Sequence, residues 1–138
     1  MEIKQISVFL DNTAGRLGEV TRVLAKAGIN LRAISLADTK DFGILRLIAD
    51  NCDEALNALK QAGFTTKISD VVAVKIEDTP GSLAGVMELF EKAKVNIEYV
   101  YASLGNENGK AVVIFKLEDH QKGLKILTEK GLTMVGSF

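Results

Sequence analysis

Apolar and polar residues alternate between residues 3 and 10, with Ile6, Val8 and Leu10 on one side and Ser7 and Phe9 on the other. A period of two is typical of a strand that buries one face. The apolar residues then recur every three or four positions, which predicts a helix from about residue 17 to residue 27. The chain is therefore expected to begin with a strand, a polar turn and an amphipathic helix.

The same two periods predict four further elements in the first half of the chain. They are strands over 29–37 and 42–49, a helix over 53–62 and a short strand over 64–68. The resulting order, β-α-β-β-α-β, is that of the ferredoxin-like sandwich, in which an antiparallel sheet carries two helices on one face.

The polar turn after the first strand occurs twice in the chain. Residues 8–20, VFLDNTAGRLGEV, correspond to residues 74–86, VKIEDTPGSLAGV, at an offset of 66 residues. A two-residue insertion changes the offset to 68, so that Leu59 corresponds to Leu127 and Gly63 to Gly131. A constant offset over most of the chain indicates that one supersecondary unit occurs twice in the sequence. We therefore expect an α+β protein of two tandem modules, residues 1–69 and residues 70–138.

The second half repeats the predicted elements of the first. A helix follows Pro80, a hairpin loop covers 105–109, and a second helix covers about 120–130. The predicted strands of this half cover 72–76, 95–104, 111–117 and 132–135.

Composition narrows the class of protein. Hydrophobic residues make up 47% of the chain, and the formal net charge of −1 gives no electrostatic footprint for nucleic acid. We find no apolar run near 18 residues and no signal-peptide pattern. The single cysteine cannot form an internal disulfide. We therefore expect a cytoplasmic protein that binds neither nucleic acid nor a membrane.

Side chains suited to catalysis are scarce. His120 is the only histidine and is expected on the solvated surface, whereas Cys52 is expected to be a small packing residue. Metal-ligand spacing and the glycine patterns of nucleotide sites are absent from the sequence, so we expect neither a metal nor a cofactor. Asp11 and Asp78 lie at helix entrances, where carboxylates commonly serve as caps. The sequence therefore favours a protein without catalytic activity.

The duplicated turn is the remaining candidate for a functional site. It ends at the first turn of a helix, where backbone N–H groups and the positive end of the helix dipole suit a small carboxylate. Gly15 and Gly81 would let a ligand approach the backbone, although a sharp turn alone also requires glycine. Asn30 and Asn96 open the second strand of each half, where an Asn can also serve only to tolerate a strained dihedral angle. The residues alone leave both interpretations open.

The two turns, followed by Gly28-Ile29-Asn30-Leu31 and by Val95-Asn96-Ile97, resemble the signature of ACT domains. ACT domains are small regulatory modules that bind amino acids and control metabolic enzymes. The resemblance covers nearly the whole chain, and the spacing of fifteen residues from Gly15 to Asn30 fits the family pattern. In the family, the ligand lies where two modules pair edge to edge, between the polar turn of one and the strand-initial Asn of its neighbour. The resemblance therefore implies a free-standing double module that senses an amino acid.

The resemblance also implies which residues contact the ligand. Asn12 and Asn30 match the binding asparagines of the family in the first half, and Asn96 matches in the second, where Asp78 replaces the turn asparagine. A carboxylate at that position would repel a ligand carboxylate and could hold an ammonium instead, so the two sites should differ. The ligand-binding residues expected on this basis are Asp11, Asn12, Thr13, Ala14, Gly15, Arg16, Leu17, Asn30, Asp78, Thr79, Gly81, Ser82, Leu83 and Asn96.

Other function classes fit the sequence less well. A regulatory or structural subunit of an amino-acid biosynthetic enzyme, without a ligand of its own, is the main alternative. A small phosphatase would need a catalytic constellation that the sequence does not offer. An RNA-binding protein would need exposed aromatics and basic strands, whereas aromatic residues make up only 6% of the chain. We therefore expect a sensor that signals to a metabolic-enzyme partner or through its own assembly.

The strand faces predict how the protein assembles. If Leu45 and Leu47 face the helices, the opposite faces of the two sheets carry apolar residues that water should not meet: Phe9, Ile44, Ile48, Val112 and Ile114. A contiguous apolar patch usually marks an interface. Either the two halves of one chain cover these faces or a second copy does, and the nearly linkerless join between residues 65 and 72 favours a second copy. We therefore expect a homodimer in which two sheets pack face to face.

Overall fold

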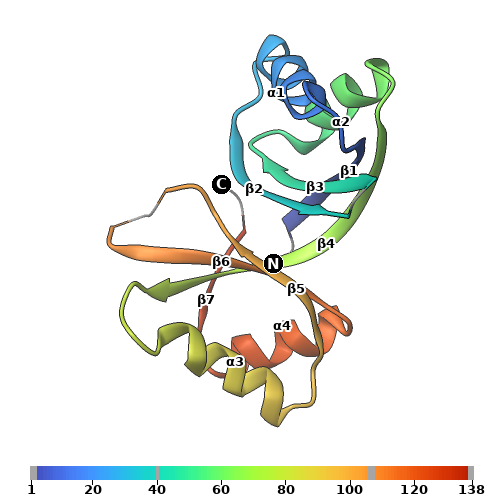
Figure 1. The fold of residues 1–138 in the computed structure, drawn as a ribbon. Coiled ribbons are helices and arrows are strands. Elements are labelled where there is room, and N and C mark those ends of the chain that lie inside the picture. Colours follow the sequence, from blue (N-terminus) through green and yellow to red (C-terminus); the bar gives the residue numbers. More distant parts are fainter. Residues whose placement is uncertain (1–2, 40, 106–107, 137–138) are drawn as a thin grey trace. The chain divides into compact units, whose positions relative to one another are not determined.

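The computed structural model describes residues 3–39, 41–105 and 108–136 (Figure 1). The chain divides into two compact units, one of Lys4–Ser69 and one that begins at Asp70. Each unit is an α+β sandwich of antiparallel strands and two helices, which confirms the predicted fold class. Residue 40 of the expected turn 38–41 and residues 106 and 107 of the expected hairpin loop lie outside the described residues.

The first unit follows the predicted β-α-β-β-α-β order. Its strands lie in the order β2-β3-β1-β4, with Leu45 of β3 opposite Val8 of β1 and Leu36 of β2. The elements are β1 (Ile3–Asp11), α1 (Arg16–Lys26), β2 (Leu31–Asp38), β3 (Phe42–Ala49), α2 (Cys52–Gln61) and the first part of β4 (Thr65–Glu77).

The second unit repeats this topology. Its strands lie in the order β5-β6-β4-β7, which is the first unit's order with each strand replaced by its counterpart. In addition to the later part of β4, its elements are α3 (Ser82–Lys92), β5 (Ile97–Ala102), β6 (Lys110–Leu117), α4 (His120–Glu129) and β7 (Thr133–Val135).

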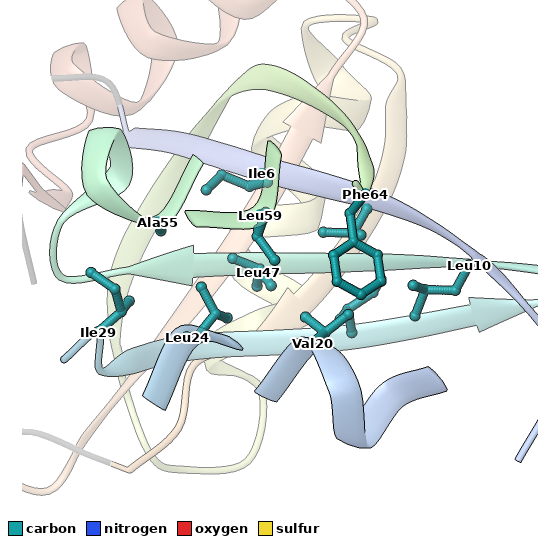
Figure 2. Packing of buried hydrophobic residues seen from close by; sticks show 11 residues of the cluster. Ile6, Leu10, Val20, Leu24, Ile29, Leu47, Ala55, Leu59 and Phe64 are labelled. Carbon is teal, nitrogen blue, oxygen red and sulfur yellow. The ribbon is translucent and has the colours of Figure 1, made fainter. Parts of the chain in front are cut away.

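Each unit has its own core between its helices and one face of its sheet. In the first unit, Val20 and Leu24 of α1 and Leu59 of α2 pack against strand residues that include Ile6 and Leu47 (Figure 2). The corresponding positions Val86, Phe90 and Leu127 form the core of the second unit with Val72, Val74, Phe115 and Leu117. The central positions of the predicted helical stripes are therefore buried, whereas Leu17 and Leu83 at the starts of α1 and α3 are exposed.

The join between the halves differs from the prediction. Two separate strands were expected over 64–68 and 72–76, but β4 is one continuous strand of 13 residues. The connecting residues Ser69, Asp70 and Val71 include neither glycine nor proline. Without such a residue nothing in the local sequence breaks the extended backbone, so the chain passes from one unit to the next within a single strand.

The sheet faces opposite the helices carry the residues on which the homodimer prediction rested. Leu45 and Leu47 belong to the helix-side core, so Ile48 lies on the opposite face as expected. However, Ile48, Val112 and Ile114 are only 2%, 3% and 0% exposed in the single chain. Alternation shows that a face is apolar and must be buried, but it does not show what buries it. The homodimer therefore stays a prediction.

Candidate functional site

The helices that follow the duplicated turns begin differently from the other two. The N-cap residues of α1 and α3 are Gly15 and Gly81, both in the left-handed conformation with φ of 88°. At α2 and α4, by contrast, the side chains of Asn51 and Asp119 accept a hydrogen bond from a backbone N–H of the first turn. A glycine has no side chain to occupy these donors, so α1 and α3 offer first-turn N–H groups to an external acceptor.

This geometry decides one alternative that the sequence left open. Asp11 and Asp78 were candidates for helix caps, but each lies before the N-cap glycine of its helix. Their carboxylates are exposed, and Asp11 lines a pocket beside its turn. They are therefore placed to meet solvent or a ligand rather than to cap a helix.

The first turn is tied to the connection between β2 and β3 through Asn12. Its backbone N–H donates to the carbonyl oxygen of Asp41 at 3.0 Å. Its side-chain Nδ2 lies 3.2 and 3.5 Å from the two carboxylate oxygens of Asp38 and 3.4 Å from the carbonyl oxygen of Thr39. Both the backbone and the side chain of Asn12 are therefore held by residues that are distant in sequence.

A pocket of about 60 Å³ opens beside this turn. A single water needs roughly 10–15 Å³ of such space, so the pocket holds a group of several heavy atoms. Apolar side chains form part of its wall, and two of them, Leu17 and Leu36, remain 40% and 47% exposed. The residues that line it are Leu10, Asp11, Asn12, Thr13, Arg16, Leu17, Leu36, Asp38 and Gly43.

Arg16 brings a positive charge to a pocket that also contains two carboxylates. It forms an ion pair with Glu19 one turn along α1, and its guanidinium carbon lies 4.9 Å from the ring centroid of Phe64. These contacts hold the guanidinium in place by charge and by a cation–π interaction. Arg16, Asp11 and Asp38 all line this pocket, so residues of both charge signs surround it, and the charge of Arg16 is partly balanced by Glu19.

The second turn has a different set of side chains. At the offset of 66 residues, Asp78 stands for Asn12, Ser82 for Arg16, and Leu104 for Asp38. The hydroxyl oxygens of Thr79 and Ser82 lie 2.8 Å apart. This turn therefore lacks the guanidinium and the supporting carboxylate of the first, while Asp78 places a carboxylate on the turn itself.

The residue before Asp78 is also a carboxylate, but it has a partner of opposite charge. Glu77 pairs with Lys110 at 3.0 Å, across the β4–β6 ladder. Its charge is therefore partly balanced, whereas the second turn gains no cation that corresponds to Arg16.

Asn30 and Asn96 lie away from the turns of their own units. Each precedes the strand that follows α1 or α3, whereas the turn precedes the helix. An 11-residue helix is about 16 Å long, so Asn12 and Asn30 lie near opposite ends of α1. One unit therefore does not bring its own turn and its own strand-initial asparagine together.

The alternative explanation for Asn30 and Asn96, that an asparagine there serves only to tolerate a strained dihedral angle, is wrong. The left-handed residues after α1 and α3 are Gly28 and Lys94, with φ of 72° and 58°, two positions before the asparagines. The backbone carbonyl of Asn30 accepts from Asp50 N–H, and that of Asn96 accepts from Glu118 N–H, both at 3.0 Å. Neither asparagine is among the described residues with a positive φ. Both side chains are exposed.

The structure brings together most of the first-half residues expected to bind a ligand. Asp11, Asn12, Thr13, Arg16 and Leu17 line one pocket, with Ala14 and Gly15 in the same turn. Sequence reasoning missed Asp38, Leu36 and Gly43, which reach this pocket from β2 and β3. The available signal was the acidic turn at 38–41, which the alternation pattern marked only as the end of a strand.

The two residues considered for catalysis are poorly placed for it. His120 is half-buried, with both ring nitrogens buried, so the expectation of a solvated residue is wrong; it begins α4, where the chain turns back from β6. Burial raises the pKa of the Cys52 thiol, and the carboxylate of Asp53 raises it further, against the opposing effect of Lys4. A raised pKa reduces the thiolate fraction that a nucleophile needs.

A model of the ACT domain pair family matches this chain over residues 1–137. The chain belongs to the ACT domain pair family. It is also similar to the crystal structure of protein BT0572 from Bacteroides thetaiotaomicron, with 41% sequence identity and a TM-score of 0.92. That match covers 98% of this chain and 92% of the other. No match is found among curated proteins.

Two further solved structures share the fold of this ACT domain pair. One is the ligand-free regulatory subunit of aspartate kinase from Thermus thermophilus, at 20% identity and a TM-score of 0.65, with 91% of each chain covered. The other is the regulatory subunit of aspartate kinase from Thermus flavus, at 20% identity and a TM-score of 0.63, with 94% of this chain and 92% of that chain covered. At this identity the likeness shows the fold alone.

Across residues 3–39, 41–105 and 108–136, we find no cluster of three or more His, Cys, Asp or Glu side chains able to hold a metal ion. Within the same ranges, no helix has the length and apolar character needed to span a membrane.

Proposed function

We propose that this ACT domain pair is a non-catalytic regulatory protein that binds a free α-amino acid at its first duplicated turn. The observation that carries the proposal is the pocket beside that turn, where Arg16 and the start of α1 lie close to Asp11 and Asp38. An α-amino acid carries one charge of each sign on adjacent atoms, and this pocket offers partners for both. The family of the chain supports the choice of ligand class.

The carboxylate of the ligand is assigned to the start of α1. The first-turn N–H groups there are not occupied by a capping side chain, because the N-cap residue is Gly15. Backbone N–H groups and the positive end of the helix dipole together favour an anion at this place. Arg16 adds a guanidinium on the same helix.

The second turn is proposed to bind an amino acid more weakly or not at all. Asp78 would face a ligand carboxylate with a like charge, and Ser82 replaces the guanidinium of Arg16. The residues Asp78, Thr79, Gly81, Ser82 and Leu83 would then keep the shape of the site without its charge balance.

A complete site requires an asparagine from another module. Asn30 lies near the far end of α1 from the pocket, so it cannot close the pocket of its own unit. We propose that pairing in a homodimer supplies this asparagine, as the family pattern implies. The proposal rests on that family pattern and on the placement of Asn12 and Asn30 near opposite ends of α1.

The alternative is a regulatory or structural subunit that binds no ligand and acts on an amino-acid biosynthetic enzyme in the cytoplasm. The fold of aspartate kinase regulatory subunits is compatible with it. What distinguishes the two is whether the pocket at the first turn is ever filled.

A thermal-shift screen of the twenty amino acids, followed by isothermal titration calorimetry, tests the proposal. A ligand present at 100 times its dissociation constant adds roughly 2.7 kcal/mol to the free energy of unfolding. We expect one amino acid, or a small group of related ones, to raise the melting temperature. Arg16→Gln should reduce that response, whereas Lys92→Gln, a cation in the last turn of α3, should not. A flat response to all twenty would favour the ligand-free subunit.

A further inference from the structure

We propose that Asp38 is a positioning residue that turns the amide oxygen of Asn12 toward the ligand, so that this wall of the pocket takes the ammonium end of the amino acid. The inference rests on the proposed function and adds to it which end of the ligand meets the turn. Asp38 was not among the residues that the sequence suggested.

The orientation of Asn12 follows from its hydrogen bonds. Its Nδ2 lies within 3.5 Å of three acceptors, the two carboxylate oxygens of Asp38 and the carbonyl oxygen of Thr39. A side-chain amide donates only through nitrogen and accepts only through oxygen. The reverse rotation would set the amide oxygen against a carboxylate and would lose these bonds. Asp38 therefore fixes which end of the Asn12 amide points away from β2.

The fixed amide determines what the pocket can recognise. An amide oxygen has two lone pairs, so it can accept from a ligand in addition to any partner in the protein. An ammonium has three donors and a positive charge, and it would meet this oxygen together with the carboxylate of Asp38. A ligand carboxylate at the same place would meet only acceptors and negative charge. The ammonium end therefore belongs at Asn12 and Asp38, and the carboxylate end at the start of α1.

In the second half, the carboxylate lies on the turn instead of at the supporting position. Where the first turn has an amide supported by an acid, the second has Asp78 on the turn and Leu104 at the supporting position. Leu104 is 57% exposed and offers no acceptor through its side chain. Each turn thus keeps one carboxylate at this pair of positions, but only the first combines it with a cation at the helix start.

Two variants and a matched control separate this role from a general loss of charge. Asp38→Ala removes the acceptor for the Asn12 amide, whereas Asp38→Asn keeps an acceptor oxygen without the charge. The control is Asp41→Asn, which also removes one carboxylate from the β2–β3 connection. Its side chain does not line the pocket, and its backbone carbonyl still accepts from Asn12 N–H.

Calorimetry is carried out with the amino acid that binds the parent most tightly and with the carboxylic acid of the same skeleton that lacks the amino group. Such pairs are alanine with propionate and leucine with 4-methylpentanoate. We expect Asp38→Ala to weaken amino-acid binding about ten- to a hundredfold, the factor that a hydrogen bond to a charged group is worth. Asp38→Asn should fall between this variant and the parent, and Asp41→Asn should match the parent. The deaminated acid should bind the parent at least about tenfold more weakly than the amino acid, and Asp38→Ala should narrow that difference.

A spectroscopic readout tests the orientation without a ligand. In a ¹⁵N correlation spectrum, the side-chain NH₂ resonances of Asn12, assigned by their loss in Asn12→Ala, should move in Asp38→Ala and stay in place in Asp41→Asn. Unchanged Asn12 resonances in Asp38→Ala would overturn the inference.

The outcomes also distinguish this inference from the proposed function. If the parent binds none of the twenty amino acids, the proposed function is overturned and the inference falls with it. If the parent binds an amino acid but Asp38→Ala binds it equally well, or if the deaminated acid binds the parent equally well, the inference alone is overturned.

Discussion

Replacing Asn12 with aspartate tests the charge arrangement of the first turn. The substitution keeps the size of the side chain but exchanges a donor 3.2 Å from Asp38 for a second carboxylate. A hydrogen bond to a charged group contributes roughly 1.5–3 kcal/mol, and exposure to solvent reduces this to about 1 kcal/mol or less. Two like charges about 4 Å apart in water add roughly 1 kcal/mol of repulsion. We therefore expect Asn12→Asp to lower the free energy of unfolding by about 1–2 kcal/mol at pH 7.

The cost of this substitution should depend on pH in a defined direction. The charge of Asp38 raises the pKa of the carboxyl introduced at position 12 above its value of about 3.9 in the unfolded chain. A group whose pKa is raised by folding binds more protons in the folded state, so stability falls as pH rises through the raised pKa. The difference between variant and parent should therefore be small at pH 4 and full at pH 7.

Urea denaturation of parent and variant at the two pH values measures this difference. Asp78→Asn is the reciprocal control, because the supporting position behind it is Leu104 rather than an acid. Asp78→Asn should change the free energy of unfolding by no more than about 0.5 kcal/mol, as most substitutions of exposed residues do. An Asn12→Asp variant as stable as the parent at both pH values would refute the contact between Asn12 and Asp38.

Three further substitutions and one reaction test the structure away from this contact. Gly15→Ala and Gly81→Ala should each cost about 1–2 kcal/mol in urea denaturation, because a φ of 88° disfavours any side chain even where space is open; equal stability to the parent would contradict the left-handed caps. Gly123→Ala should destabilise the second unit by about 1–3 kcal/mol despite its better helix propensity, since the added Cβ would lie 2.1 Å from Leu117 Cδ1; a gain in melting temperature would show that this helix has more room. Iodoacetamide should alkylate Cys52 in the native protein more slowly at pH 8 than in the urea-unfolded chain, because the pKa of its thiol is raised; a faster reaction in the native protein would contradict that shift.

The spacing of apolar residues, every two positions in strands and every three or four in helices, was enough to predict the fold of each unit. Val20 and Leu24 on α1, and Val86 and Phe90 on α3, were expected from their spacing and are buried. The continuity of β4 was not predicted, because polar residues mark the end of a buried pattern but do not by themselves end a strand. The inward and outward directions of strand residues were predicted correctly, but the pattern does not show what covers outward residues such as Ile48 and Ile114. Burial depends on what covers a face, and that information is not local to the strand.

The candidate site could be predicted only in part for a similar reason. Asn12 and Arg16 could be predicted because they lie within the duplicated turn, although Asp78 and Ser82 stand at the corresponding positions of the second half. Asp38 is distant in sequence and is replaced by Leu104 in the second half, so the repeat could not reveal it. Its role depends on the antiparallel pairing of β2 with β3, which brings the end of β2 beside the turn.

Chemical-shift mapping shows whether an amino acid binds at the first turn. Backbone amide resonances of the intact chain are followed while the tightest-binding amino acid from the screen is added. We expect the largest changes at residues 11–18, with smaller changes at the corresponding residues 77–84. Changes of equal size at both turns would contradict the proposed difference between the sites. Changes confined to other parts of the chain, or none with any of the twenty amino acids, would contradict binding at the first turn itself.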